Sequence, residues 1–124
     1  MPSVFTPADA NRTLPLVKRI VSDILSKGRE LQSLQPDQAR QEVGDRVWKL
    51  EHDLHDHIEE LGSIGCSYKD FGFKLGLVDF PGEIDGESVL LCWRSDEETV
   101  AHYHGYADGY AGRRPIPSGL LEGP

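Results

Sequence analysis

Apolar and polar residues alternate along the first half of the chain with the spacing of an amphipathic helix. Between residues 14 and 31 the apolar positions recur every three or four residues, which places them on one side of a helix. They are Leu14, Val17, Val21, Ile24, Gly28 and Leu31, widened by Ile20 and Leu25. Thr6 and Pro7 predict the start of this helix, as a side-chain cap and a proline in the first helical position. Pro15 either kinks the helix or begins a second segment capped by Thr13.

A second apolar series of the same kind follows a short break. Gln35-Pro36-Asp37 interrupts the first pattern and offers Asp37 as the next helix cap. The new series consists of Val43, Val47, Leu50, Leu54 and Leu61, with Ile58 beside it. We expect this helix to end near Gly62, because glycine readily takes the left-handed conformation at a helix end. Two helices of similar length joined by a short break predict an antiparallel helical hairpin over about residues 6–62.

From Cys66 onward the period changes to that of β-strands. Four short segments separated by turn residues either alternate or are continuously apolar. They are residues 66–69, 75–80, 88–94 and 98–103. We expect Pro81-Gly82 to close the second segment, while Asp85-Gly86 and Ser95-Asp96 bound the third. Strands at this interval predict an antiparallel meander over about residues 66–104, without helices crossing between them.

The C-terminal part of the chain is rich in turn residues. Residues 105–124 hold five of the 13 glycines and three of the eight prolines. We expect an ordered Gly/Arg-rich loop to about Ile116, because Tyr106 and Tyr110 need cover, and then a frayed tail. The predicted fold is therefore α+β: a single domain of residues 1–124 in which a long helical hairpin precedes a small meander and this loop.

Composition narrows the classes of function. The chain of 124 residues has a formal net charge of −8, which disfavours binding to nucleic acid or to anionic membranes. No apolar run approaches the roughly 20 residues of a membrane span, and Met1-Pro2-Ser3 does not resemble a secretory signal. Cys66 and Cys92 are too few for a disulfide framework. We therefore expect a reduced cytoplasmic protein, and a homodimer, because a core of this size leaves little margin of stability.

Three of the five histidines lie on the second predicted helix. His52 and His55 are one turn apart, with Glu59 on the same stripe, so the three could converge on a metal ion. Acidic neighbours make a solvated helix face the alternative for these two histidines. His57 instead falls on the apolar side of the helix, seven residues after Leu50. It must either be buried with a partner or face a cavity.

The other two histidines end the last predicted strand. His102 and His104 flank Tyr103, and alternation along a strand sends both imidazoles to one face. A His-x-His pair on a strand can give a metal ion two nitrogen ligands. The alternative is that both are half-exposed strand residues without a ligand.

Asp79 is the one carboxylate within an otherwise apolar strand. A buried carboxylate needs hydrogen bonds, a positive partner or a metal ion. Asp79 could accept from backbone amides after Pro81, pair with an arginine or ligate a metal. Arg113 and Arg114 follow a glycine-rich stretch, where they could bind an anion or fix the loop through an ion pair, with Asp79 as a candidate partner. No helix follows them, so the stretch is not a nucleotide-binding loop.

The cysteines and the remaining motifs exclude several enzyme classes. Cys92 lies between apolar residues and is expected to pack as a small buried hydrophobe. Cys66 and Cys92 do not form a C-x-x-C pair, so a dithiol redox role has little support. The chain also lacks a Gly-x-Ser-x-Gly turn and a Walker-type loop.

Blocks spread over most of the chain resemble the bacterial DUF2203 family, a domain of unknown function. The blocks are Phe5-Thr6 with Asn11 and Leu14-Pro15, then Gly76-Leu77-Val78-Asp79-Phe80-Pro81, Leu91-Cys92-Trp93, His104 and Gly109-Tyr110-Ala111-Gly112-Arg113. The resemblance implies cytoplasmic placement and selects Asp79, Cys92, Trp93, His104 and Arg113 as motif positions. His52, His55 and His102 lie outside these blocks, and Tyr103 stands where the family pattern implies a tryptophan.

Two hypotheses of function follow. The first is a metal-binding domain with an iron or zinc site between the second helix and the last strand, supplying chemistry through an open coordination position. Its candidate ligands are His104, His57, His102, Glu60 and Asp79. A non-covalent haem, held by one histidine against Trp93, Tyr103 and Tyr106, is a variant of this hypothesis. The second is a dimeric interaction module that uses the helical hairpin as its working surface.

Overall fold

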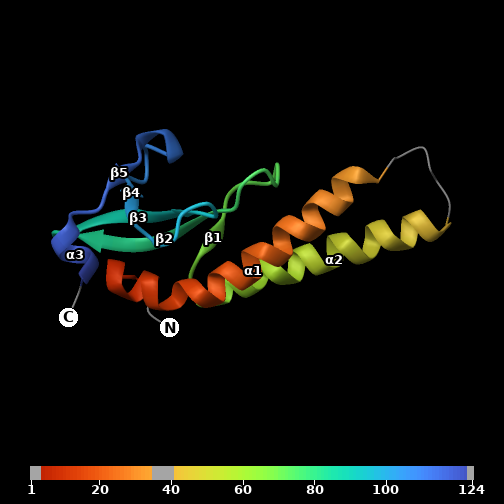
Figure 1. Ribbon diagram of the computed structural model, residues 1–124, viewed down its shortest axis with the longest axis horizontal. Coiled ribbons are helices and arrows are strands. Elements are labelled where there is room, and N and C mark those ends of the chain that lie inside the picture. Colours follow the sequence, from red (N-terminus) through yellow and green to blue (C-terminus); the bar gives the residue numbers. More distant parts are fainter. Residues whose placement is uncertain (1–3, 35–40, 123–124) are drawn as a thin grey trace.

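Two long helices and a five-stranded antiparallel sheet make up the fold, which confirms the predicted α+β class. The computed structural model describes residues 4–34 and 41–122. Helix α1 spans Pro7–Ser33 and α2 spans Gln41–Ile64. The helices pack side by side as a long arm that extends beyond the sheet, while the first half of α1 runs beneath it (Figure 1). The predicted cap Asp37 lies outside the described residues.

Helix α1 begins as the sequence predicts but is not divided at Pro15. The Thr6 hydroxyl accepts from the Asp9 amide at 3.1 Å, and the Asp9 carboxylate accepts from the Thr6 amide at 3.2 Å. Pro15 lies inside the continuous helix. Pro15 is exposed, whereas Leu14 and Val17 are buried on either side of it and hold both turns against the core.

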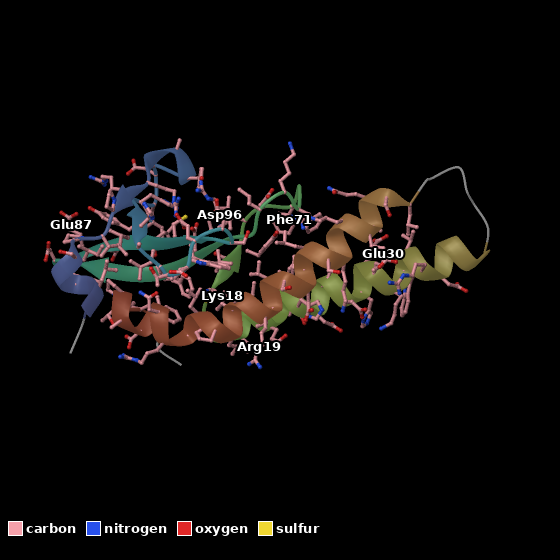
Figure 2. The ribbon with its side chains drawn as sticks, viewed as in Figure 1. Lys18, Arg19, Glu30, Phe71, Glu87 and Asp96 are labelled. Carbon is pink, nitrogen blue, oxygen red and sulfur yellow. The ribbon has the colours of Figure 1, made fainter. Side chains whose placement is uncertain are left out.

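The second helix runs two residues beyond its predicted end at Gly62. It stops at Ile64 because Gly65 adopts a positive φ of 107°, and the Cys66 amide then donates to the Leu61 carbonyl at 3.0 Å. Charged side chains cover the outside of the arm (Figure 2). On that surface Arg46 donates twice to the Glu30 carboxylate, at 2.6 Å each.

The sheet is a meander in which each strand pairs antiparallel with the next. The strands are β1 (Ser67–Tyr68), β2 (Leu77–Ile84), β3 (Glu87–Arg94), β4 (His102–His104) and β5 (Arg114–Pro115). The turn between β2 and β3 is Asp85-Gly86, with φ of 51° and 82°, the conformation that two-residue hairpin turns favour. The 3₁₀ turn η1 (Tyr110–Gly112) precedes β5, and α3 (Ser118–Glu122) ends the described chain. The predicted frayed tail therefore contains a short helix.

Pro81 and Gly82 do not end β2 as the sequence suggested. The Pro81 carbonyl points away from β3 and accepts from the Phe5 amide at 2.7 Å. In an antiparallel strand the amide and carbonyl of one residue point the same way, so the missing N–H of Pro81 costs the β2–β3 ladder nothing. At Gly82 a Cβ would lie 2.9 Å from the Phe5 carbonyl oxygen, which explains why a glycine is needed there.

The last predicted strand is also shorter and later than expected. Residues 98–101 are not a strand, because the Asn11 side chain of α1 binds Val100 in place of a neighbouring strand. Asn11 Oδ1 accepts from the Val100 backbone amide at 2.8 Å, and Asn11 Nδ2 donates to the Val100 backbone carbonyl at 3.0 Å. Pairing with β3 therefore begins only at His102, which lies opposite Cys92.

Alternation gives the sheet two different faces. Val78, Phe80, Leu91 and Trp93 are buried in the core with the apolar sides of the helices. Their neighbours in sequence, including Asp79 and Cys92, point to the opposite face, over which the C-terminal loop runs (Figure 1). No helix among the described residues is long and apolar enough to cross a membrane.

Candidate metal centre

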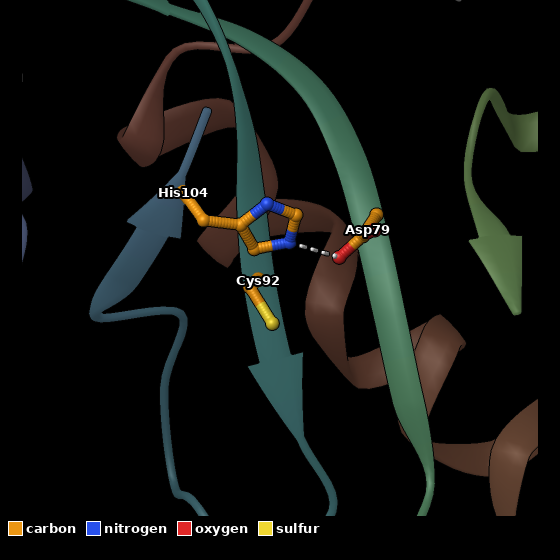
Figure 3. A group of neighbouring side chains, drawn as sticks. All are labelled: Asp79, Cys92 and His104. Carbon is orange, nitrogen blue, oxygen red and sulfur yellow. Dashed lines mark hydrogen bonds and ion pairs between the residues drawn. The ribbon is translucent and has the colours of Figure 1, made fainter. Parts of the chain in front are cut away.

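The register of the sheet brings three side chains with metal-binding atoms together. Asp79 lies directly opposite Cys92 across β2 and β3, and His104 reaches the same point from β4. One potential ligand atom of each residue lies within 4.8 Å of the other two. All three residues are buried, with Asp79 at 5%, Cys92 at 1% and His104 at 3% exposure. Figure 3 shows them converging on one face of the sheet, away from the helix behind it.

The hydrogen bond that His104 makes through Nδ1 leaves its other ring nitrogen, Nε2, as an acceptor that faces the carboxylate of Asp79. Its Nδ1 lies 2.9 Å from the Gly105 carbonyl oxygen, which can only accept, so Nδ1 carries a proton. In a neutral imidazole Nε2 then presents a lone pair, and it faces Asp79 Oδ1 at 3.3 Å. A lone pair and a carboxylate oxygen repel unless a cation lies between them. The arrangement therefore requires either a proton between the two atoms, on the ring or on the carboxyl group, or a metal ion.

The Cys92 thiol is held in its protonated form. Burial raises its pKa to about 11, and the negative charge of Asp79 acts in the same direction. A thiol in this state is a poor nucleophile. The Asp79–Cys92–His104 cluster therefore lacks the activated thiolate of a cysteine hydrolase, although a metal ion would displace the proton and use the sulfur as a ligand.

A cavity of about 250 Å³ opens beside the cluster. Apart from the three cluster residues, it is lined by Lys69, Leu77, Leu90, Tyr106, Gly109 and Tyr110. The tyrosines belong to the C-terminal loop, so the loop forms one wall of the cavity instead of simply covering the sheet. A ligand in this cavity would lie against the cluster.

Arg94, Arg113 and Glu97 fix the loop wall in place. The Arg94 guanidinium donates to the Tyr110 hydroxyl, and the Arg113 guanidinium lies 5.1 Å from the centre of the same ring. Arg113 also donates to Glu97 at 2.6 Å and to the Cys92 carbonyl at 3.2 Å. Arg113 therefore fixes the loop, as one of its two predicted roles required, but its acidic partner is Glu97 and not Asp79.

The opposite wall is fixed by the connection between β1 and β2. The Asp70 carboxylate accepts from the amides of Leu75, Gly72 and Lys74, which lowers the pKa of Asp70. In the same connection Phe73, at a φ of 57°, lies over Gly28 of α1. A Cβ on Gly28 would come within 2.3 Å of the Phe73 ring, so this contact needs a glycine on the helix.

The structure does not join the helix-borne candidates to those on the strands. Within the described chain, the groups of converging ligand atoms contain either sheet residues or residues of α2, and none combines the two. His57 Nε2 lies 2.9 Å from the Lys27 ammonium, and its Nδ1 lies 3.9 Å from Glu60. The structure therefore does not bring the predicted ligands together between the second helix and the last strand, because alternation turns Asp79 and His104 to the sheet face that α2 does not cover.

His102 and Arg114 lie outside the cluster. His102 is opposite Cys92, and its Nδ1 lies 3.3 Å from a Glu97 oxygen, without the geometry of a hydrogen bond. Arg114 begins the outermost strand β5 and is exposed, 5.2 Å from the Tyr103 ring and 3.8 Å from Asp108.

The exposed histidines of α2 match the solvated-face alternative. His55 pairs with Glu59 at 3.0 Å, and both side chains are more than 60% exposed. His52, Asp53 and Asp56 form a second group of possible ligands, but Asp53 already pairs with Lys49 at 3.0 Å. A metal ion there would have to displace that ammonium in open solvent.

The candidate ligands chosen from the sequence do not include Cys92, and the neighbours Lys69 and Glu97 are not predicted either. The family resemblance selects Cys92 as a motif position, but its apolar surroundings predict only a buried packing residue. One signal could have found it: Asp79 and Cys92 are equally distant from the Asp85-Gly86 turn, and a two-residue turn sets such residues opposite each other. For Lys69 and Glu97 the sequence carries no comparable signal.

The fold and the cluster together define a small α+β protein whose meander sheet carries a buried Asp–Cys–His group. The chain belongs to the DUF2203 family, described as uncharacterized conserved proteins, whose family model matches residues 3–116. This confirms the family that the sequence blocks indicated. No curated protein and no solved structure was found to match the chain.

Proposed function

We propose that this protein binds one divalent transition metal ion, with zinc favoured, through Asp79, Cys92 and His104. The observation that carries the proposal is the contact between His104 Nε2 and Asp79 Oδ1. A positive charge must lie between the two atoms, which a metal ion would supply in place of a proton, and Nδ1 is already turned to a carbonyl, which is the usual support of a metal-ligating histidine.

The distance within this contact suits a tetrahedral metal site. With metal–nitrogen and metal–oxygen bonds of about 2.0 to 2.2 Å, two ligands of a tetrahedral zinc ion lie roughly 3.3 to 3.5 Å apart. His104 Nε2 and Asp79 Oδ1 lie 3.3 Å apart. The Cys92 sulfur, within 4.8 Å of both, would move closer to become the third ligand.

The donor set favours zinc over the other predicted cofactors. Imidazole, carboxylate and thiolate together suit a borderline-soft ion such as Zn²⁺, with ferrous iron as the next choice. The cavity of about 250 Å³ is smaller than the roughly 300 to 1,000 Å³ of pockets that bury drug-sized molecules, so a metal ion with a small ligand fits better than haem. Three protein ligands leave one position open toward this cavity, as in zinc sites that act on a bound water or substrate.

The competing function, a dimeric module using the helical hairpin, has less support. Most of the apolar residues that motivated it are buried against each other and the sheet. The described large apolar residues that remain exposed on the helices, Leu16 and Trp48, lie on different helices and near opposite ends of the arm. A homodimer stays a prediction.

A chelator-competition titration tests the proposal with a matched pair of variants. Protein purified without a histidine tag should bind one zinc ion per chain, and His104→Gln should abolish this binding. His102→Gln removes a histidine from the same strand but outside the cluster, so its zinc affinity should stay within about threefold of the parent. Equal losses in both variants, or zinc bound equally well by His104→Gln, would refute the proposed site.

A further inference from the structure

We propose that the cavity beside the Asp79–Cys92–His104 cluster binds a small organic monocarboxylate, with its charge between the metal and Lys69. The inference deepens the proposed function and rests on it, because the open position of the metal supplies half of the binding site. The other half consists of side chains that the cluster itself does not use.

The balance of charges selects a monoanion. Ionised Asp79 and Cys92 together neutralise a divalent ion, and His104 adds no charge as a ligand. Lys69, an exposed residue that lines the cavity, then supplies one positive charge, and its side chain has no hydrogen-bond or ion-pair partner among the described residues. A single negative charge would complete this site.

The neighbouring arginines do not add to that positive charge. Each already has a carboxylate within ion-pair distance in the described structure. The pairs are Arg94–Asp96 at 2.5 Å, Arg113–Glu97 at 2.6 Å and Arg114–Asp108 at 3.8 Å. Lys69 is thus the cation on which a bound anion would depend.

The rest of the cavity is suited to an apolar body. Leu77 and Leu90 lie on the sheet, and Tyr106 and Tyr110 on the loop, so aliphatic and aromatic surfaces face each other across the space. Tyr106 is 61% exposed, so its ring is accessible to a ligand in the cavity. An inorganic anion would leave these surfaces wet, whereas an organic acid would cover them.

Both walls are held in position before a ligand arrives. The Tyr110 ring is fixed by its contacts with Arg94 and Arg113, and the loop that follows Lys69 is fixed by the Asp70 carboxylate. A preformed cavity loses little conformational freedom on binding, which favours a small ligand with few contacts.

Calorimetric titration of the zinc-loaded protein tests the inference. Benzoate is the probe, benzamide is its uncharged analogue, and inorganic phosphate is an anion without an apolar body. Lys69→Met removes the charge while keeping a long side chain. Lys74→Met is the matched control, because Lys74 is exposed on the same connection but does not line the cavity. Zinc content is measured in every sample before any ligand is added.

Benzoate should bind saturably and at least tenfold more tightly than benzamide and phosphate. Lys69→Met should weaken benzoate at least tenfold, while Lys74→Met should change it less than twofold. Equal binding of benzamide, preference for phosphate, absence of benzoate binding or an unchanged affinity in Lys69→Met would each overturn the carboxylate site. A sample that fails to hold zinc overturns the proposed function instead, and the elemental analysis shows this separately.

Discussion

Asp79 is the residue on which the cluster depends most. Its carboxylate is buried in a strand and meets the nitrogen of His104 and the thiol of Cys92, without a lysine or arginine within ion-pair distance in the described chain. A buried carboxylate in such surroundings is costly unless a cation compensates it. A metal ion bound to all three side chains would remove this cost in one step.

Replacing Asp79 with asparagine, a residue of nearly the same size, should therefore reduce metal affinity. Asp79→Asn keeps the shape but offers a much weaker ligand, and we expect zinc affinity to fall at least about a hundredfold, since even outer-shell partners are worth 10- to 100-fold. Chelator competition measures the loss. Asp56→Asn is the control, because Asp56 belongs to the exposed group on α2. If only Asp56→Asn lost zinc binding, the metal site would have to be assigned to α2 instead of the sheet.

Zinc affinity should also rise with pH because of Cys92. Its thiol has a raised pKa of about 11, so at neutral pH the metal must displace a proton to bind the sulfur. Each such proton makes the apparent affinity increase about tenfold per pH unit. Titrations between pH 6.5 and 8 should show at least this slope, and Cys92→Ser should show a shallower one. A slope near zero in the parent protein would mean that the thiol is not a ligand.

In the metal-free protein the buried thiols of Cys92 and Cys66 should make the free energy of unfolding decrease as the pH rises. The folded-state pKa values of Cys92 and Cys66 lie above the ordinary thiol value, at about 11 and about 12. Stability from these protonated thiols is therefore complete below about pH 9 and decreases as the pH rises toward 11 and 12. Urea unfolding at pH 8 and pH 10 should show a lower free energy of unfolding at the higher pH. Cys66→Ser should reduce the difference.

Among the individual residues, the sequence predicted His104 and Asp79 as members of the candidate site but not Cys92. His104 and Asp79 stood out because an ionisable group in an apolar strand needs a partner. Cys92 was a motif position of the family resemblance but not a candidate ligand, because a cysteine between leucine and tryptophan can equally well be a core residue. His57 was grouped with the site because a sequence does not state which sheet face a helix covers.

At the scale of elements, the C-terminal loop is built to hold its tyrosines at the cavity. Asp108 lies at the centre of this loop and accepts from the Gly105 amide. A Cβ on Gly105 would come within 2.7 Å of the Asp108 carboxylate, and one on Gly112 within 2.6 Å of the Asp108 Cβ. The glycines are therefore packing requirements here.

Gly112→Ala should destabilise the protein by about 1 to 3 kcal/mol, the usual cost of overpacking. The Asp108 Cβ is attached to the backbone, so it cannot move aside without shifting the loop. Urea unfolding measures the change. Gly119→Ala is the control, because a Cβ there meets no atom within 4 Å and alanine favours the helix in which Gly119 lies. Equal stability of Gly112→Ala and the parent would show that the loop adapts freely.

Element boundaries were predicted well where local chemistry decides them and poorly where distant contacts do. Thr6 caps α1 and Asp85-Gly86 turns the hairpin, as the local sequence indicated. The continuation of β2 through Pro81 depends on Phe5, and the late start of β4 depends on Asn11. Both partners are more than 70 residues away in the sequence, so the local pattern could not reveal them.

At the scale of the whole molecule, metal binding should couple to the stability of the sheet. The three ligands come from β2, β3 and β4, so a bound ion would connect the central strands. A ligand at 100 times its dissociation constant stabilises the folded state by about 2.7 kcal/mol. For a protein of this size, zinc should then raise the melting temperature by roughly 10 °C. Calorimetry with and without zinc measures the shift, and at the same zinc concentration Asp79→Asn should shift by no more than about 2 °C.

The most direct test of the central claim is the absorption spectrum of the cobalt-substituted protein. Cobalt(II) takes the place of zinc, and a bound thiolate adds a charge-transfer band in the near ultraviolet. The chain has two buried cysteines, of which only Cys92 lies in the cluster. We predict one cobalt ion per chain with a thiolate band that is lost in Cys92→Ser and kept in Cys66→Ser. A band that survives in Cys92→Ser, or protein that takes up no cobalt, would contradict the proposed metal site.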